Sequence, residues 1–269
     1  MAIWDDVVPE AERRIYEVGG WGRRMGFGAK PAVLVVDVNY DFVGDKPEPI
    51  MESIKRWRYS CGEAGWEGVR AIQRLLAAAR PKGVPIIYTT VEHRADALDY
   101  GRDRDKNFRT GEATSLAGGK GPEIPCEIAP TPADVVISKK KASAFFGTPL
   151  ASYLIDLGVD TLFVTGVSTS GCVRATVVDG HAYNFRMCLV EEGCFDRSVV
   201  AHKVNLFDMH MKYADVVSLA ETKRYFARLP NPALRAAAES TPPRQRTRRA
   251  PRPAKAGTVV SGRRQRLVS

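Results

Sequence analysis

The feature that most constrains the fold is a continuous apolar run near the start of the chain. Residues 31–38 read PAVLVVDV, and Asp37 is the one polar side chain among them. Such runs are typical of central strands in a parallel sheet that helices cover on both faces. Ligands bind in open α/β sheets beyond the carboxyl ends of the strands, so Asp37 is a candidate site residue. Aspartate is also a preferred helix-capping residue, which is the alternative interpretation of Asp37.

Apolar runs and helical patterns alternate along the rest of the chain. We expect further strands at 84–90, 134–138, 161–165, 185–190 and 215–219. Apolar residues at helical spacing and residues typical of helix ends predict helices at 66–79, 149–158, 199–213 and 221–229. Strands that alternate with helices predict an α/β fold of three layers, in which helices cover both faces of a central, mostly parallel six-stranded sheet.

The net charge of +9 is concentrated at one end of the chain. Residues 230–269 contain nine arginines and one lysine but a single glutamate, so the rest of the chain is balanced. This segment has too few large apolar residues to fold, which predicts a disordered basic tail. The predicted regions are therefore an arm at 1–29, an α/β domain at 30–229 and the tail at 230–269. The tail lacks aromatic residues that stack on bases, so we expect it to bind nucleic acid non-specifically at most.

The cysteines and histidines indicate neither a disulfide framework nor a metal site. The five cysteines are an odd number without a CxxC pair, which is typical of free thiols in a reducing compartment. The four histidines form neither an HExxH motif nor a compact cluster with cysteine, so we expect no metal and no cofactor. No apolar run is long enough to cross a bilayer, and the first residues do not resemble a signal peptide. We therefore expect a cytoplasmic protein that contacts no membrane.

A candidate nucleophile lies in residues 161–179, which read TLFVTGVSTSGCVRATVVD. The predicted strand is followed by small residues and then by apolar residues at helical spacing, which places Cys172 in the first turn of a helix. Unpaired N–H groups at such a helix start favour a thiolate and can hold an oxyanion. The alternative is an unreactive buried cysteine, because free cysteines are often buried.

Three other segments are candidates for parts of the site. Lysines at 139–141 follow a predicted strand, and we expect one of them to point toward Asp37 and the other two to be solvated. Residues 92–128 form a long polar segment of the kind that serves as a lid or binding loop. The aromatic and basic run at 55–59 predicts a substrate mouth, a subunit contact or a solvated face.

Taken together, three segments resemble the isochorismatase-like cysteine hydrolase family: VLVVDVNYDF, ISKKKASAFFGT and VTGVSTSGCVRATVVD. The resemblance covers roughly residues 31–229, and NLFDMHMKYADVVS and GCFDR are most similar to the branch of the N-carbamoylsarcosine amidohydrolases. It implies a catalytic triad of Asp37, Lys139 and Cys172. Asp37 would accept the thiol proton and later activate water, Lys139 would lower the thiol pKa, and Cys172 would form a thioester with the substrate.

The resemblance also implies how the substrate is held. A cis peptide bond is expected between Val167 and Ser168, with an oxyanion bound by N–H groups near Ser168 and Cys172. Arg197 and Ser168 correspond to residues that bind a substrate carboxylate, a group that a guanidinium suits because it donates in parallel. A surface ion pair is the alternative interpretation of Arg197.

The expected activity is hydrolysis of a C–N bond in a small linear amide or carbamoyl compound that bears a carboxylate, with release of ammonia. N-carbamoylsarcosine is the first candidate, maleamate or ureidoacrylate is the second, and a non-amidase hydrolase of the same fold is the third. Nicotinamidases carry a metal-binding Asp-x-His motif, and residues 45–65 contain no histidine. The arm and the family imply a homodimer or homotetramer. A protein that acts on nucleic acid through its basic tail is a further alternative. Because the rest of the chain has no net charge, we expect nucleic-acid binding to be at most an accessory role.

Overall fold

The computed structural model describes residues 2–96, 98–107, 109 and 119–230. Within them lies a six-stranded sheet with the strand order β3-β2-β1-β4-β5-β6. All pairs of neighbouring strands are parallel. The strands are β1 (Pro31–Val36), β2 (Ile86–Val91), β3 (Val135–Lys139), β4 (Thr161–Val167), β5 (Arg186–Phe195) and β6 (Asp215–Val217). The predicted α/β fold is confirmed. The predicted tail lies, apart from its first residue, outside the described residues.

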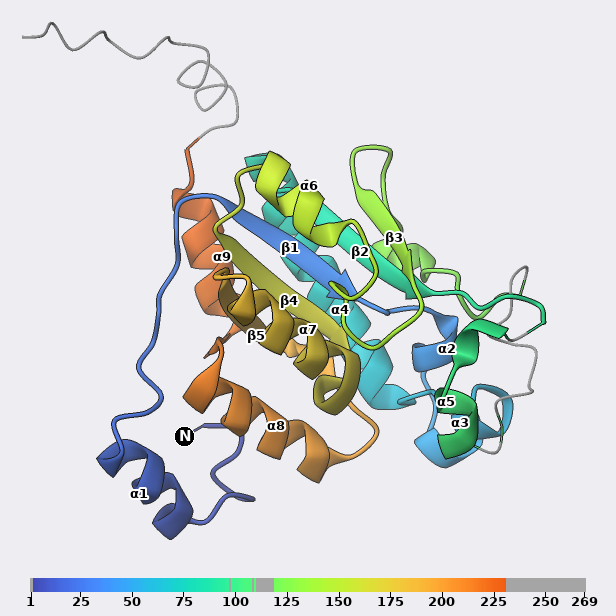
Figure 1. Cartoon of the computed structure of the whole chain (residues 1–269), viewed down its shortest axis with the longest axis horizontal. Coiled ribbons are helices and arrows are strands. Elements are labelled where there is room, and N and C mark those ends of the chain that lie inside the picture. The colour runs from blue at the N-terminus through green and yellow to red at the C-terminus, as the bar shows by residue number, and fades with distance from the viewer. Residues whose placement is uncertain (1, 97, 108, 110–118, 231–269) are drawn as a thin grey trace, which may run out of the picture. The chain divides into compact units, whose positions relative to one another are not determined.

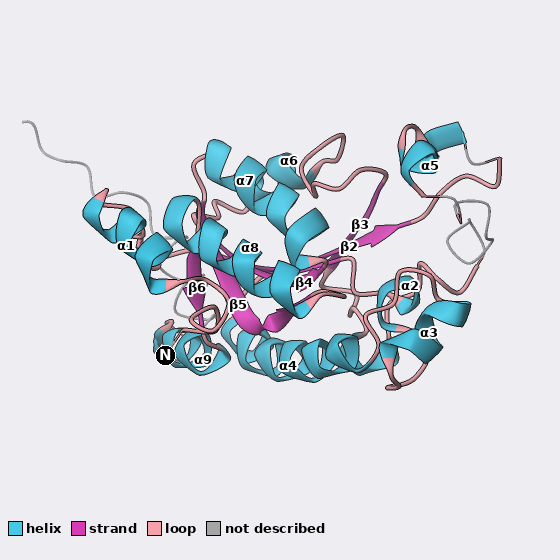
Figure 2. Ribbon diagram, turned by 90° about the horizontal axis from the view of Figure 1, so that it is seen from below, coloured by secondary structure: helices cyan, strands magenta, loops and turns pink. Residues whose placement is uncertain are grey.

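Helices cover both faces of the sheet, as Figures 1 and 2 show. One face packs against α4 (Glu63–Ala79) and α9 (Leu219–Arg228). The other face packs against α6 (Leu150–Asp156), α7 (Arg174–Ala182) and α8 (Val199–Lys212). These are the three layers that the sequence predicts.

The apolar run at 31–38 is buried because β1 contributes to two cores. Val33 and Val35 belong to the cluster beneath α4 and α9, whereas Leu34 and Val36 belong to the cluster beneath α6, α7 and α8. Successive side chains of a strand point to opposite faces, so a strand covered on both faces is apolar at most of its positions. Every residue of β1 and β4 is buried.

The residues before β1 contribute no strand to the sheet. Their helix α1 (Glu10–Val18) has no buried residue. The following stretch is fixed to the end of the sheet by Asp215, whose carboxylate accepts hydrogen bonds from the backbone N–H groups of Met25 (3.0 Å) and Gly26 (2.8 Å). Within the described residues, every helix is too short or too polar to cross a lipid bilayer.

The structure departs from the predicted elements in the loops. The expected loop after β1 contains α2 (Tyr40–Val43), and the run around 55–59 begins in α3 (Ile50–Arg56). The long segment after β2 contains η2 (Leu98–Tyr100), α5 (Asp103–Lys106) and η4 (Cys126–Ile128), with η1 (Arg80–Lys82) before β2. Helices this short hold few hydrogen bonds of their own and depend on tertiary contacts, so sequence periodicity does not reveal them.

The strand β5 is longer than predicted. It continues past Val190 to Phe195, and the register shifts between Val164 and Gly166 of the neighbouring strand β4. The polar residues at 191–193 indicated a loop, but Cys194 and Phe195 are buried and extend the pairing. The irregularity brings the end of β5 beside the segment that holds Cys172.

Candidate active site

The carboxyl ends of five adjacent strands meet at one edge of the sheet. In the order of the strands from β3 to β5, the residues at these ends are Lys139, His93, Asp37, Ser168 with Cys172, and Arg197. In open parallel sheets this edge is where ligands bind. The strand order therefore explains why residues far apart in the chain converge on one site.

Asp37, Lys139 and Cys172 are in contact. The Lys139 ammonium lies 2.7 Å from the Oδ2 atom of Asp37 and 3.5 Å from the Sγ atom of Cys172. Its Nζ atom also donates a hydrogen bond to the backbone oxygen of Lys141 at 2.8 Å. Asp37 and Lys139 are fully buried, and Cys172 is half-buried. The arrangement is a buried ion pair beside a thiol that is open on one side.

Asp37 is turned toward the site by an unusual backbone conformation. Its φ angle is 55°, in the left-handed region that non-glycine residues seldom adopt. The Thr89 hydroxyl donates to the Oδ1 atom of Asp37 at 2.8 Å, and the Asp37 N–H donates to the Thr89 carbonyl at 3.1 Å. Asp37 does not cap the following helix, because α2 starts after Asn39. The capping alternative is therefore wrong.

The Cys172 segment also differs from its predicted form. Cys172 lies in a single π-helical turn, η5 (Thr169–Val173), and α7 begins after it. The Val167–Ser168 peptide bond is cis. Before this bond, Gly166 has a φ of 112°, and a Cβ atom there would lie 2.0 Å from the Val36 carbonyl. Only glycine permits β4 to approach β1 this closely.

Contacts from β5 and α8 hold the same segment in place. The Thr169 hydroxyl donates to the Phe195 carbonyl at 3.1 Å and lies 2.8 Å from Nδ1 of His202. The Asp196 carboxylate accepts hydrogen bonds from both the N–H (2.8 Å) and the hydroxyl (2.7 Å) of Ser170. The N–H of Ser170 is thereby occupied, so it is not available for an oxyanion.

The pKa values of Lys139 and Cys172 are set by burial and by their neighbours. Burial lowers the pKa of Lys139, but Asp37 and Cys172 outweigh it, so this pKa is raised and the ammonium stays charged. Burial raises the pKa of the Cys172 thiol to about 12, Asp37 raises it further, and Lys139 opposes both. Lys139 thus lowers the thiol pKa as expected, but burial and Asp37 outweigh it, so the pKa of Cys172 is raised in the resting site. Cys172 is a thiol, and Asp37 is the adjacent base.

We expect the substitution Asp37→Asn to lower the pKa of Cys172. The carboxylate that disfavours a thiolate is lost, while the Lys139 ammonium that favours it remains. At pH 8 the alkylation of Cys172 by iodoacetamide should be about tenfold faster or more, because the thiolate is the reactive form. Peptide mass spectrometry measures this rate, and the exposed Cys126 serves as an internal control. An unchanged or slower rate at Cys172 would contradict the assigned electrostatics.

Lys139 and Cys172 open into a cavity of about 570 Å³, and Asp37 lies buried behind them. Lys139, Ser168, Cys172 and Arg197 form part of its wall. The other lining residues are Asp41, Phe42, Tyr59, Val91, His93, Asp103, Lys106, Asn107, Lys140, Lys141 and Ala142. A cavity of this size suits a small molecule. Cationic side chains outnumber carboxylates in the wall, which favours an anionic ligand.

Arg197 borders the cavity beside two aromatic rings. Its Nη2 atom donates to the Tyr59 carbonyl at 2.6 Å. The guanidinium lies 5.6 Å from the ring centre of Phe42 and 5.9 Å from that of Tyr59, and the two rings stack at 5.3 Å. Within the described residues Arg197 forms no ion pair, so the surface ion pair expected as its alternative is absent there. Its Nε and Nη1 atoms form no hydrogen bond within the described residues, and Arg197 lines the cavity.

The run at 55–59 is divided: Lys55 and Arg56 are exposed, as a solvated face predicts, whereas Arg58 and Tyr59 are turned inward. Tyr59 lines the cavity, and the Arg58 guanidinium lies 4.1 Å from the centre of the Tyr59 ring. Arg58 is 8% exposed, and none of its guanidinium nitrogens has a hydrogen-bond partner among the residues that the structure describes. The sequence offered one clue to this arrangement, the alternation of basic and aromatic residues.

The long segment after β2 also reaches the cavity. His93, Asp103, Lys106 and Asn107 line it, in agreement with a binding loop, whereas residues 110–118 of the predicted lid lie outside the described residues. Two of the three lysines at 139–141 form polar contacts with the segment after β2. Lys140 pairs with Asp99 and Lys141 donates to the carbonyls of η2, so the expectation that both are simply solvated is wrong. No cluster of three metal-ligating side chains occurs in the parts of the chain that the structure describes.

Residues 31–221 match the family described as "Isochorismatase domain". The chain is 38% identical over 205 residues to a maleamate amidohydrolase of Pseudomonas putida, a match that covers 74% of this chain and 88% of the relative. It is 35% identical over 226 residues to an N-carbamoylsarcosine amidase of an Arthrobacter species, covering 82% of this chain and 80% of the relative.

Solved structures of related proteins have the same fold. An isochorismatase family protein from Desulfovibrio vulgaris superposes with a TM-score of 0.65 at 30% identity, covering 75% of this chain and all of the other. An N-carbamoylsarcosine amidase from Thermoplasma acidophilum superposes with a TM-score of 0.57 at 26% identity, covering 71% and 96% of the two chains.

Proposed function

The chain belongs to the isochorismatase family and is a hydrolase of carbon–nitrogen bonds other than peptide bonds; from this premise we propose that it acts through a thioester on Cys172. The proposed substrate is a small linear amide or carbamoyl compound that bears a carboxylate. The observation that carries the proposal is the contact of Asp37, Lys139 and Cys172 in a cavity that Arg197 also lines. A base, a charge-stabilising ammonium, a nucleophile and an anion-binding group are thus available together.

In the first half of the reaction, the Cys172 thiol gives its proton to Asp37 as its sulfur attacks the carbonyl carbon. The oxyanion is held by backbone N–H groups near Ser168 and Cys172. The C–N bond then breaks, and the leaving nitrogen takes the proton from Asp37 and departs as ammonia. The substrate acyl group remains on sulfur as a thioester.

In the second half, Asp37 takes a proton from a water molecule that attacks the thioester. The C–S bond breaks, Cys172 regains its proton and the carboxylic or carbamic acid product leaves. The net change is one amide plus one water giving one acid plus ammonia. Because the resting thiol has a pKa of about 12, its proton transfer accompanies the attack, and the Lys139 ammonium stabilises the negative charge that passes between sulfur and carboxylate.

The substrate class follows from the cavity and the relatives. Arg197 supplies a guanidinium with free donors beside an aromatic wall, which suits a carboxylate. Maleamate and N-carbamoylsarcosine, named for the two relatives, both combine a carboxylate with a terminal –CONH₂ group. We place N-carbamoylsarcosine first, with maleamate and ureidoacrylate as the alternatives.

Ammonia release from a panel of amides tests the proposal. The panel contains N-carbamoylsarcosine, maleamate, ureidoacrylate and the uncharged aromatic amide nicotinamide. We expect release from at least one carboxylated amide and a much lower rate with nicotinamide. Release from nicotinamide alone, or from none of the four, would contradict the proposed substrate class.

We expect Arg197→Ala to weaken the hydrolysis of carboxylated amides selectively. Loss of a charged hydrogen bond of about 1.5–3 kcal/mol should lower kcat/KM for maleamate by roughly 10- to 150-fold, mainly through KM. Crotonamide has the same chain length without the carboxylate, and its kcat/KM should change less than threefold. Steady-state ammonia release measures both, and Arg197→Lys should be intermediate because it keeps the charge but not the paired donors. Equal losses on the two amides would rule out the carboxylate contact.

A further inference from the structure

His93 is a cavity residue to which the proposed mechanism gives no role. It follows the end of β2, is 6% exposed and lines the cavity together with Cys172. Its ring stacks on that of Tyr100 with a centroid distance of 3.8 Å and an interplanar angle of 19°. Because the ring is buried and stacked, its nitrogen atoms point in fixed directions.

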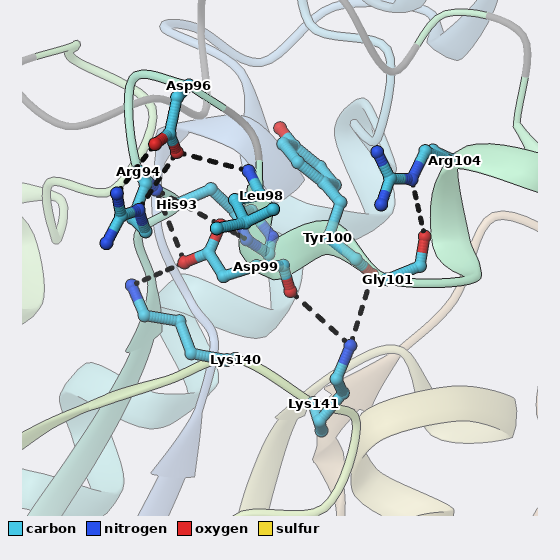
Figure 3. A network of polar contacts seen from close by, with 10 residues as sticks. All are labelled: His93, Arg94, Asp96, Leu98, Asp99, Tyr100, Gly101, Arg104, Lys140 and Lys141. Atoms are coloured by element: carbon cyan, nitrogen blue, oxygen red, sulfur yellow. Dashed lines mark hydrogen bonds and ion pairs between the residues drawn. The ribbon is translucent and has the colours of Figure 1, made fainter.

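The Nδ1 atom of His93 is occupied by Asp99, at 3.3 Å from Oδ1 (Figure 3). The Asp99 carboxylate also accepts from the Arg94 N–H and lies 3.3 Å from the Lys140 ammonium. Burial raises the pKa of Asp99, but these contacts outweigh it and lower the pKa, so the group is ionised. An ionised carboxylate accepts hydrogen bonds only, so the proton of the ring lies on Nδ1.

The other nitrogen, Nε2, is left as an acceptor. Burial lowers the pKa of His93, and Asp99 opposes this only in part, so the ring is neutral near pH 7. Within the described residues Nε2 forms no hydrogen bond, and the atom is not fully enclosed by protein. It is therefore accessible from the cavity that His93 lines. Lys139, Lys140 and Lys141, which line the same cavity, only donate hydrogen bonds.

The strand order fixes which end of the substrate faces His93. Across the sheet, His93 at β2 and Arg197 at β5 lie on opposite sides of Cys172 at β4. A linear substrate with its carboxylate at Arg197 and its carbonyl at Cys172 directs its terminal amino group toward the β1–β2 side. Asp37, which must deliver a proton to that nitrogen, is on the same side.

We propose that Nε2 of His93 accepts a hydrogen bond from the terminal –NH₂ group of the substrate, so that the site selects primary amides and ureides over analogues that lack this N–H. The inference rests on the proposed function and deepens it. His93 is then a binding residue that orients the leaving group, and Asp99 is the residue that keeps its Nε2 unprotonated.

The experiment compares each amide with an ester of the same acid. For maleamate the matched ester is monomethyl maleate, and for N-carbamoylsarcosine it is N-methoxycarbonylsarcosine. The amide is followed as a substrate through kcat/KM, and the ester as a competitive inhibitor through Ki. Wild type is compared with His93→Phe, which keeps a ring on Tyr100 but has no acceptor, and with His93→Gln, which restores an acceptor. His93→Leu replaces the Phe variant if that protein does not fold.

In His93→Phe, kcat/KM for the amide should fall about 10- to 100-fold, because a buried donor on the substrate loses its partner. Ki for the ester should change less than threefold, and His93→Gln should recover part of the amide activity. Equal changes in kcat/KM for the amide and in Ki for the ester would assign His93 a structural role and overturn the inference. An unchanged kcat/KM for the amide would also overturn it. If wild type releases ammonia from none of the three carboxylated amides of the panel, the proposed function itself fails and the inference falls with it. If wild type hydrolyses an amide but His93→Phe changes the amide and ester values equally, only the role of His93 is overturned.

Discussion

Lys139→Met is expected to lower the free energy of unfolding by about 3–5 kcal/mol and to abolish turnover. Lys139 is 1% exposed, and its partner Asp37 is fully buried at 2.7 Å. Removal of the ammonium leaves the buried Asp37 carboxylate without a counter-ion. Such a charge is destabilising by far more than the pair itself contributes. Turnover fails because the negative charge that forms on sulfur also loses its partner.

Urea unfolding measures the change, with two matched variants. Lys140→Met removes the neighbouring lysine, which is 42% exposed in its side chain and pairs with Asp99, so we expect less than about 1 kcal/mol. The double variant Asp37→Asn/Lys139→Met removes both charges and should regain much of the lost stability without regaining activity. If Lys139→Met were no more destabilising than Lys140→Met, the buried pair would not hold the site together.

The sheet could be predicted from the sequence because its strands are buried on both faces. In β1 and β4 every residue is buried and most contribute to one of two cores, and this requirement leaves an apolar run that is visible without a structure. Short elements such as α2 and α5 leave no such pattern. The end of β5 was missed because its polar residues lie where the register shifts against β4.

The position of the site was predictable, but its lining was not. Parallel strands bring their carboxyl ends to one edge, so a polar residue at the end of an apolar run, such as Asp37, is informative. Which of three adjacent lysines points inward depends on the strand's pleat and its exact end, and Lys139 was identified from the family resemblance. His93 and Tyr59 lie in loops, where side-chain direction has no period to reveal it.

The pKa of Cys172 shows how an argument from neighbouring residues in the sequence can give the wrong direction of a pKa shift. A cysteine at the start of a helix favours a thiolate through nearby N–H groups. In the folded chain, burial and the Asp37 carboxylate act on Cys172 more strongly than Lys139 does, and the pKa rises to about 12. Neither burial nor the distance to Asp37 can be read from residues 161–179 alone.

Cys172→Ala is expected to lower kcat for ammonia release by about 10⁴- to 10⁶-fold, the range found when single members of a catalytic triad are removed. Cys172 is the sulfur that lies 3.5 Å from the Lys139 ammonium and opens into the cavity. Without it no thioester forms, and Asp37 and Lys139 can only hold water near the bound amide. Alanine is smaller than cysteine and leaves the buried ion pair intact, so the variant should fold.

The measurement that tests the account most directly is the initial rate of ammonia release by wild type, Cys172→Ala and Cys126→Ala on the best amide of the panel. Cys126 is exposed and does not line the cavity, so its variant controls for the loss of a thiol as such. We predict that Cys126→Ala matches wild type, whereas Cys172→Ala is indistinguishable from buffer. A Cys172→Ala rate within tenfold of wild type would contradict the thioester mechanism and, with it, the assignment of this edge of the sheet as a cysteine hydrolase site.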